Sequence, residues 1–120
     1  MKILFIEDDE NVSKLAKEVF IRTTHDVIMC PCPFNAIKVL SVEDFDLVIL
    51  DMHFSDGNGG DVLQYMKENK INTPVFIHSG HVKKFSSVID YYKEVGLVKM
   101  VYEKPSLFTK DFLTKINSFV

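Results

Sequence analysis

The sequence lacks the features that mark several broad classes of protein. No apolar run approaches the roughly 20 residues that cross a bilayer, and acids interrupt the opening MKILFI before it reaches the length of a signal-peptide core. No basic stretch is dense enough to follow a phosphate backbone, because 14 basic residues are spread among 17 acidic ones and the net charge is −3. We therefore expect a soluble, cytoplasmic protein that binds neither a membrane nor a nucleic acid.

Cysteine is scarce as well. Cys30 and Cys32 flank one proline, which is neither the CxxC spacing of a redox motif nor half of a zinc site with a second ligand pair elsewhere in the chain. Free cysteine commonly behaves as a small buried apolar residue. We therefore interpret both cysteines as structural.

Apolar residues are plentiful enough for one core. With 120 residues, 47% of them hydrophobic, the chain fits one globular domain and leaves no room for a second. No linker, internal repeat or low-complexity tract divides it. We expect a single domain over residues 1–120, without an output domain.

Short apolar runs alternate with segments of helical spacing. The runs, which are typical of strands buried on both faces, cover residues 2–6, 26–30, 46–50, 75–78 and 98–102. Apolar stripes at helical spacing follow each run, with Pro33 and Pro105 opening the second and fifth helices. Because crossovers between parallel strands are right-handed, this alternation predicts an α/β fold with a parallel sheet covered by helices on both faces.

Two loops carry further local signals. Asp9 and the acid after it fall at the start of the first predicted helix, where negative charge favours the helix dipole, so we interpret them as capping charges. After the third strand, Gly57, Asn58 and Gly59 permit left-handed backbone angles, and Asp61 suits a helix start. We expect this second loop to be explained by backbone conformation alone.

Polar side chains follow most of the predicted strands. Ligands of open α/β sheets bind beyond the carboxyl ends of the strands, so the residues found there are candidates for chemistry. They are Glu7 and Asp8 after the first strand, Asp51 after the third, Ser79 after the fourth and Lys104 after the fifth.

Four motifs at these positions together resemble the receiver domain of two-component response regulators. They are the acids in ILFIEDDE, the lone Asp with its Gly-rich turn in LDMHFSDGNGG, the hydroxyl and small residue in HSG, and a Lys-Pro pair after the fifth strand. The resemblance covers the whole chain and follows the family's order of elements. It implies a flavodoxin-like (βα)5 three-layer sandwich whose parallel five-stranded sheet has the order 2-1-3-4-5.

The resemblance also implies a phosphoryl acceptor and a metal site. Asp51 would accept the phosphoryl group as an aspartyl phosphate. Glu7, Asp8 and Asp51, with the backbone carbonyl of His53, would bind Mg²⁺ or Mn²⁺, since hard cations prefer oxygen ligands. Two like charges about 4 Å apart repel by roughly 4 kcal/mol at a surface-like dielectric, and a divalent cation would offset that repulsion.

Four residues would contact or make room for the phosphoryl group. Lys104 would approach it as a positive charge, with Pro105 fixing the loop, while Ser79 would donate its hydroxyl and Gly80 would leave space for the phosphoryl oxygens. Positioning and charge neutralisation are most of what phosphoryl transfer needs. We therefore expect a phosphoryl acceptor that assists its own reactions, not an enzyme.

Histidines stand at two further positions of the family pattern. His53 and His81 come two residues after the acceptor and after the hydroxyl residue, where family members tune the lifetime of the acyl phosphate. A second metal held by this pair lacks a third ligand in the sequence. His25 and His78 we interpret as structural.

The chain departs from the family pattern in three places. Ser55 replaces a usual proline, and Gly96 lies one residue further than usual from Lys104, which indicates an insertion or a shift of register. Val101 replaces an aromatic residue that turns inward on activation, and Tyr102 cannot substitute for it because neighbouring strand residues point to opposite faces. We therefore expect phosphorylation to cause only a small structural change, confined to the loop after the fourth strand and the start of the fourth helix.

Together these features predict Mg²⁺-dependent transfer from a phosphohistidine to Asp51. The donor would be a histidine kinase or a histidine phosphotransfer protein, and the output would pass to a partner protein or along a phosphorelay. A flavodoxin would need a hydroxyl-rich phosphate loop after the first strand, and a haloacid-dehalogenase-type phosphatase would need a second Asp where His53 stands. The remaining alternative is a degenerate receiver that docks to proteins without being phosphorylated, although the acceptor, the acids and the lysine are all present.

Overall fold

The computed structural model describes residues 1–104 and 110–118 of the chain. Its main sheet is parallel and five-stranded, in the order β2-β1-β3-β6-β7. These strands are β1 (Lys2–Ile6), β2 (Asp26–Cys30), β3 (Leu47–Leu50), β6 (Val75–Ser79) and β7 (Val98–Glu103). Counted along the main sheet, this is the predicted order 2-1-3-4-5, so the predicted flavodoxin-like fold is confirmed.

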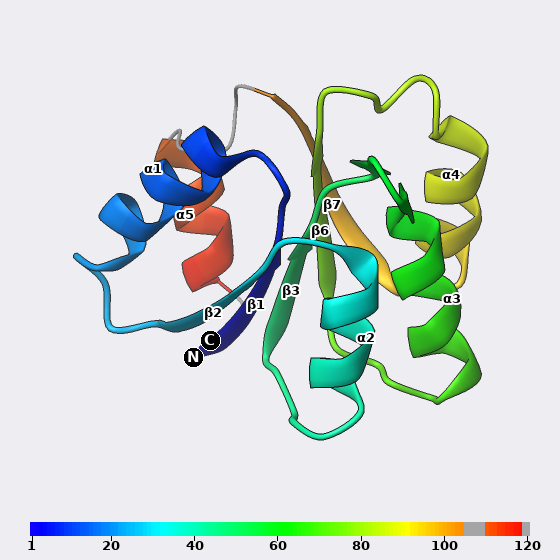
Figure 1. Cartoon of the computed structure of the whole chain (residues 1–120), viewed down its shortest axis with the longest axis horizontal. Helices are drawn as coiled ribbons and strands as arrows, with labels where there is room; N and C mark the ends of the chain where they lie inside the picture. Colours follow the sequence, from blue (N-terminus) through cyan, green and yellow to red (C-terminus); the bar gives the residue numbers. More distant parts are fainter. Residues whose placement is uncertain (105–109, 119–120) are drawn as a thin grey trace.

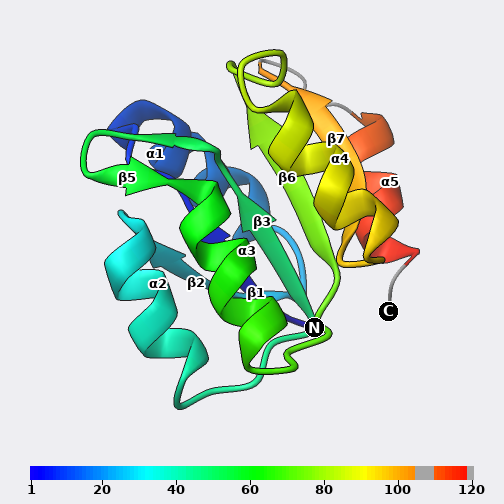
Figure 2. The ribbon, with the colours of Figure 1, turned by 90° about the vertical axis from the view of Figure 1, so that its right-hand side faces the viewer.

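Helices cover both faces of the sheet (Figures 1 and 2). On one face lie α1 (Glu10–Phe20) and α5 (Lys110–Asn117), and on the other lie α2 (Pro33–Leu40), α3 (Gly59–Glu68) and α4 (Ser86–Glu94). Pro33 is the first residue of α2, as predicted, whereas Pro105 lies outside the described residues. No helix among the described residues is long and apolar enough to cross a membrane.

The three interior strands, β1, β3 and β6, are buried on both faces. In β1, Leu4 and Ile6 pack against the side of α2, α3 and α4, while Ile3 and Phe5 pack toward α1 and α5. Each buried aliphatic or aromatic side chain stabilises the fold by about 1.5–3 kcal/mol. The carboxyl ends of β1 and β3 are therefore fixed by the core, and so are the residues that follow them.

The start of α1 explains one of the four acids in ILFIEDDE. Asp9 is the N-cap residue, and its side chain accepts hydrogen bonds from the backbone N–H of Asn11 at 2.9 Å and of Val12 at 3.3 Å. A cap of this kind contributes about 1 kcal/mol. The predicted capping role of Asp9 is confirmed.

A small hairpin that the sequence did not predict follows β3. It pairs β4 (His53–Phe54) with β5 (Gly57–Asn58) in antiparallel fashion. Gly57 has a φ of +154°, but Asn58 has a φ of −149° and caps α3, so the predicted left-handed angle at Asn58 is wrong. The predicted start of α3 is confirmed, since the Asn58 and Asp61 side chains form a capping box.

Gly59 is required by close packing against the chain after β3. A Cβ atom at this position would lie 2.5 Å from the backbone carbonyl oxygen of Asp51 and 2.8 Å from Sδ of Met52. Gly59 opens α3 with ordinary helical backbone, so the predicted left-handed angle is wrong here as well. The small size of Gly59 lets α3 approach Asp51. The expectation that backbone conformation alone explains this loop is therefore wrong.

The predicted register shift before Lys104 is confirmed as a bulge. Val75 of β6 pairs with Val98 of β7, but the next residue, Phe76, pairs with Met100. The extra residue is Lys99, and beyond it the pairing stays regular as far as the end of β6. The insertion is therefore absorbed before the strand reaches the lysine.

Candidate functional site

Three carboxylates meet at the carboxyl ends of β1 and β3. Oxygen atoms of Glu7, Asp8 and Asp51 all lie within 4.8 Å of one another. The backbone N–H of Asp51 donates to the carbonyl of Ile6 at 3.1 Å, which continues the pairing of the two strands into the site. Glu7 and Asp51 are buried, at 3% and 4% exposure, whereas Asp8 is exposed. The structure thus brings together the three acids that the sequence singled out.

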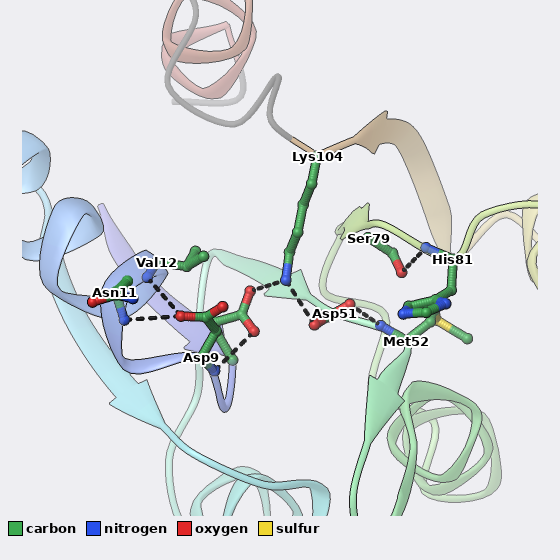
Figure 3. Close-up of polar contacts among 9 residues, drawn as sticks. Asp9, Asn11, Val12, Asp51, Met52, Ser79, His81 and Lys104 are labelled. Atoms are coloured by element: carbon green, nitrogen blue, oxygen red, sulfur yellow. Dashed lines mark hydrogen bonds and ion pairs between the residues drawn. The ribbon is translucent and has the colours of Figure 1, made fainter.

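Lys104 reaches across the sheet to two of these acids. Its Nζ lies 2.7 Å from Oε1 of Glu7. The same Nζ lies 3.0 Å from Oδ2 of Asp51 (Figure 3). Its backbone N–H donates to the carbonyl of Ser79 at 3.1 Å, which fixes the residue at the end of β7. The contact with Glu7 was not predicted, because the family resemblance assigned Lys104 only to the phosphoryl group.

The two buried carboxylates differ in their affinity for protons. Burial raises the pKa of Glu7 to about 7, with a contribution from the negative charge of Asp51, although Lys104 opposes the rise. Burial also acts to raise the pKa of Asp51, but the hydrogen bond and charge of Lys104 outweigh it and hold that pKa below its usual value. At neutral pH, Asp51 is therefore an anion, while Glu7 is close to half protonated.

Each carboxylate is also oriented by the backbone. Oδ1 of Asp51 accepts a hydrogen bond from the N–H of Met52 at 2.7 Å (Figure 3), and Oε2 of Glu7 accepts one from the N–H of Asp9 at 3.2 Å. Such contacts hold both groups in place before any ligand arrives. The arrangement offers several oxygen ligands to a hard cation and an anionic oxygen to an electrophile.

Ser79 ends β6, the strand beside β3, and is fully buried. Its Oγ accepts a hydrogen bond from the backbone N–H of His81 at 3.0 Å (Figure 3). Gly80 between them is exposed, and a Cβ there would meet open space, so nothing in this structure requires a glycine. The role predicted for Gly80 concerns a bound phosphoryl group and stays a prediction.

His78 adds a neutral ring to the buried surroundings of the site. Leu50 pairs with Ile77, so the residues that follow them, Asp51 and His78, stand side by side. Burial lowers the pKa of His78 to about 4, helped by the positive charge of Lys104. Among the described residues its Nε2 has no hydrogen-bond partner. Strand alternation from Phe76 could have placed this ring beside the acceptor, whereas the sequence predicted only a structural role for His78.

The sequence also matches a known family over most of its length. The family model described as the response regulator receiver domain matches residues 3–114. The chain belongs to the response regulator receiver domain family. It is therefore a receiver domain of two-component signal transduction, in which receiver domains are phosphoryl acceptors.

Curated relatives of this receiver domain include longer regulators. It is 31% identical over 98 residues to the cell cycle transcriptional regulator CtrA of Caulobacter vibrioides, covering 77% of this chain and 42% of that protein. It is 22% identical over 120 residues to the cell cycle response regulator CtrA of Brucella ovis, covering all of this chain and 50% of that protein. The chain thus spans about half the length of these relatives.

Solved receiver structures share the fold over almost the whole chain. The signal receiver domain of a putative Luxo repressor protein from Vibrio parahaemolyticus superposes with a TM-score of 0.83 at 25% identity, covering 98% of this chain and 86% of that one. The response regulator TrrA of Thermotoga maritima, solved in complex with Mg²⁺ and BeF, superposes with a TM-score of 0.81 at 18% identity, covering 99% and 98% of the two chains.

Proposed function

We propose that Asp51 of this receiver domain accepts a phosphoryl group from a phosphohistidine. The donor would be a histidine kinase or a histidine phosphotransfer protein. The observation that carries the proposal is the convergence of three carboxylates, within 4.8 Å, beneath one lysine. A relative of the same fold was solved with Mg²⁺ and BeF, which supports the same chemistry here.

The acids fit a hard divalent cation by the chemistry of their donors. Glu7, Asp8 and Asp51 offer carboxylate oxygens, with the backbone carbonyl of His53 as a further ligand, and Mg²⁺ or Mn²⁺ accepts such sets while keeping some waters. When bound, the cation would neutralise charge that develops on the transferring phosphoryl oxygens. The ammonium of Lys104 now contacts both Glu7 and Asp51 and offsets part of their negative charge.

The reaction is a displacement at phosphorus. A carboxylate oxygen of Asp51 attacks the phosphorus atom while the P–N bond to the donor histidine breaks, and that histidine leaves as a neutral imidazole after taking up a proton. The lowered pKa of Asp51 keeps its carboxylate ionised for this attack. Lys104 would move from the carboxylates to the new phosphoryl oxygens. Ser79 would donate its O–H to them, since its oxygen now only accepts a bond from His81.

The way in which phosphorylation is read out follows from the core. Val101 packs against the core on the side of α2, α3 and α4, whereas Tyr102 packs on the other side with Phe76 and Phe112, at ring-centroid distances of 6.2 and 5.0 Å. No aromatic residue therefore occupies the position of the usual switch. We propose that the change stays near the loop after β6 and the start of α4, and that the output passes to a partner protein or along a phosphorelay.

An intact-mass measurement tests the proposed function. Incubation with a small phosphodonor and Mg²⁺ should add one phosphoryl group, and either chelation of the metal or Asp51→Asn should abolish the addition. Circular dichroism of the variant should match that of the unchanged protein, because Asn is close in size to Asp. Addition that persists in Asp51→Asn would show that the acceptor lies elsewhere.

A further inference from the structure

Two imidazole rings lie together at the edge of the acidic site. His53, in the β4–β5 hairpin, and His81, after β6, have ring centroids 4.6 Å apart and ring planes inclined by 42°. Both residues are exposed. Among the described residues, neither ring is engaged in a hydrogen bond or an ion pair with another side chain, so their nitrogens are available to a ligand from solvent.

We infer that His53 and His81 form a second metal site, for one borderline divalent cation such as Ni²⁺ or Zn²⁺. Imidazole suits these ions, whereas Mg²⁺ prefers the carboxylates next to it, so ligand chemistry separates the two sites. Metal–imidazole bonds are about 2.0–2.1 Å long, so two nitrogens on one ion lie within roughly 4 Å of each other. Rotation of two exposed rings that already lie 4.6 Å apart can meet this requirement. Water would supply the remaining ligands.

The backbone holds both histidines in place. His53 pairs with Asn58 across the small hairpin, and the N–H of His81 donates to Oγ of Ser79 at 3.0 Å. A pair that is fixed before binding loses less conformational entropy when the ion arrives. This preorganisation was invisible in the sequence, where the two histidines are 28 positions apart.

Two lysines near the pair contact other groups. Lys104 is paired with Glu7 and Asp51, and Nζ of Lys84 lies over the ring of Phe85, 5.5 Å from its centroid. The two carboxylates offset the charge of Lys104, so this lysine opposes a bound cation less than a free one would. Water also screens the repulsion at this exposed rim.

The bond between Ser79 and His81 couples the second site to phosphorylation. If the Ser79 side chain moves toward a phosphoryl group, its oxygen is drawn away from the N–H of His81, so the contact that fixes the His81 backbone is lost and the histidine pair is loosened. This step rests on the proposed function. Because coupling between two sites is reciprocal, a phosphoryl mimic should weaken metal binding by the same factor by which the metal weakens binding of the mimic.

Calorimetric titration with Ni²⁺ in millimolar Mg²⁺ tests the site, since Mg²⁺ fills the carboxylate site and leaves nitrogen ligands to the probe. One ion should bind, and either His53→Ala or His81→Ala should weaken binding by about tenfold or more, because even second-shell changes cost 10–100-fold. His25→Ala is the matched control. The His25 ring lies 3.1 Å from the amino terminus, and these two nitrogens form the competing site for Ni²⁺. His25→Ala should leave the affinity for Ni²⁺ within about twofold of that of the unchanged protein.

The outcomes separate this inference from the proposed function. The second site would be overturned if no Ni²⁺ binds, or if binding is unchanged in each of the single variants His53→Ala and His81→Ala. Either result would count even if Asp51 is phosphorylated. Asp51→Asn should keep the histidine-dependent binding of Ni²⁺, so failure of the phosphoryl chemistry would leave the second site standing. Beryllofluoride should then weaken Ni²⁺ binding in the unchanged protein, and equal affinities with and without it would refute the coupling.

Discussion

Binding of Mg²⁺ should expel a proton from Glu7, so the affinity for Mg²⁺ should rise with pH across neutrality. Burial raises the pKa of Glu7 to about 7, and a metal ligand must be deprotonated. Lys104 now occupies Oε1 of Glu7 at 2.7 Å. The cation would therefore compete for the same carboxylate with a proton and with an ammonium.

The size of the effect follows from the raised pKa. With a pKa of about 7, roughly one Glu7 in eleven is ionised at pH 6 and roughly ten in eleven at pH 8. The apparent affinity for Mg²⁺ should therefore increase by about tenfold between these pH values, which corresponds to about 1.4 kcal/mol. A carboxylate with an ordinary pKa would be ionised at both values and would produce no such change.

Isothermal titration calorimetry in buffers of different ionisation enthalpy measures both the affinity and the number of protons released. About one proton should leave at pH 6 and almost none at pH 8. Glu7→Gln is the matched control, because it keeps the size of the side chain but cannot titrate. It should bind Mg²⁺ more weakly and lose the pH dependence. Equal affinities at pH 6 and pH 8 in the unchanged protein, without proton release, would refute the assignment of a raised pKa to Glu7.

Three further predictions concern residues around the acceptor. Lys104→Ala should still bind Mg²⁺ at pH 8 but should lose roughly 1.5–3 kcal/mol of affinity for beryllofluoride, the value of a charge-assisted hydrogen bond, and unchanged beryllofluoride affinity would remove the lysine from the phosphoryl site. The pKa of His78 falls from 6.5 to about 4, so its contribution to stability is present above pH 6.5 and is lost as pH falls through 4. In urea unfolding, His78→Leu should reduce the loss of stability between pH 7 and pH 4 by on the order of 3 kcal/mol, and parallel losses in both proteins would contradict this. Gly59→Ala should destabilise the fold by about 1–3 kcal/mol, because the added Cβ would lie 2.5 Å from the carbonyl oxygen of Asp51. The control Gly80→Ala places its Cβ in open space and should change the free energy of unfolding by less than about 0.5 kcal/mol. Equal effects of the two substitutions would refute the packing argument.

The parts of the site that depend on neighbouring residues could be predicted from the sequence. Asp9 caps α1 because a cap needs only an acid just before the helix and the free N–H groups of the first helical turn. Glu7 and Asp51 converge because parallel strands end at the same edge of a sheet. The spacing between Gly96 and Lys104 also indicated the bulge at Lys99.

The parts that depend on side-chain reach could not be predicted. The contact of Lys104 with Glu7 spans from one strand to another that is not its neighbour in the sheet, and no sequence spacing encodes the rotamer that makes it. Asn58 illustrates a second limit. Asparagine is favoured both at left-handed positions and at helix N-caps, and only the observed chain path shows that the cap prevails here.

The most direct test of the central claim is to locate the phosphoryl group on the chain. Borohydride reduces an acyl phosphate to an alcohol, so treatment of the phosphorylated protein should convert Asp51 to homoserine, which peptide mass spectrometry identifies. This conversion should occur at Asp51, should require both the phosphodonor and Mg²⁺, and should be absent at Glu7 and Asp8. Conversion at another acid, or the same conversion without the metal, would contradict the central claim.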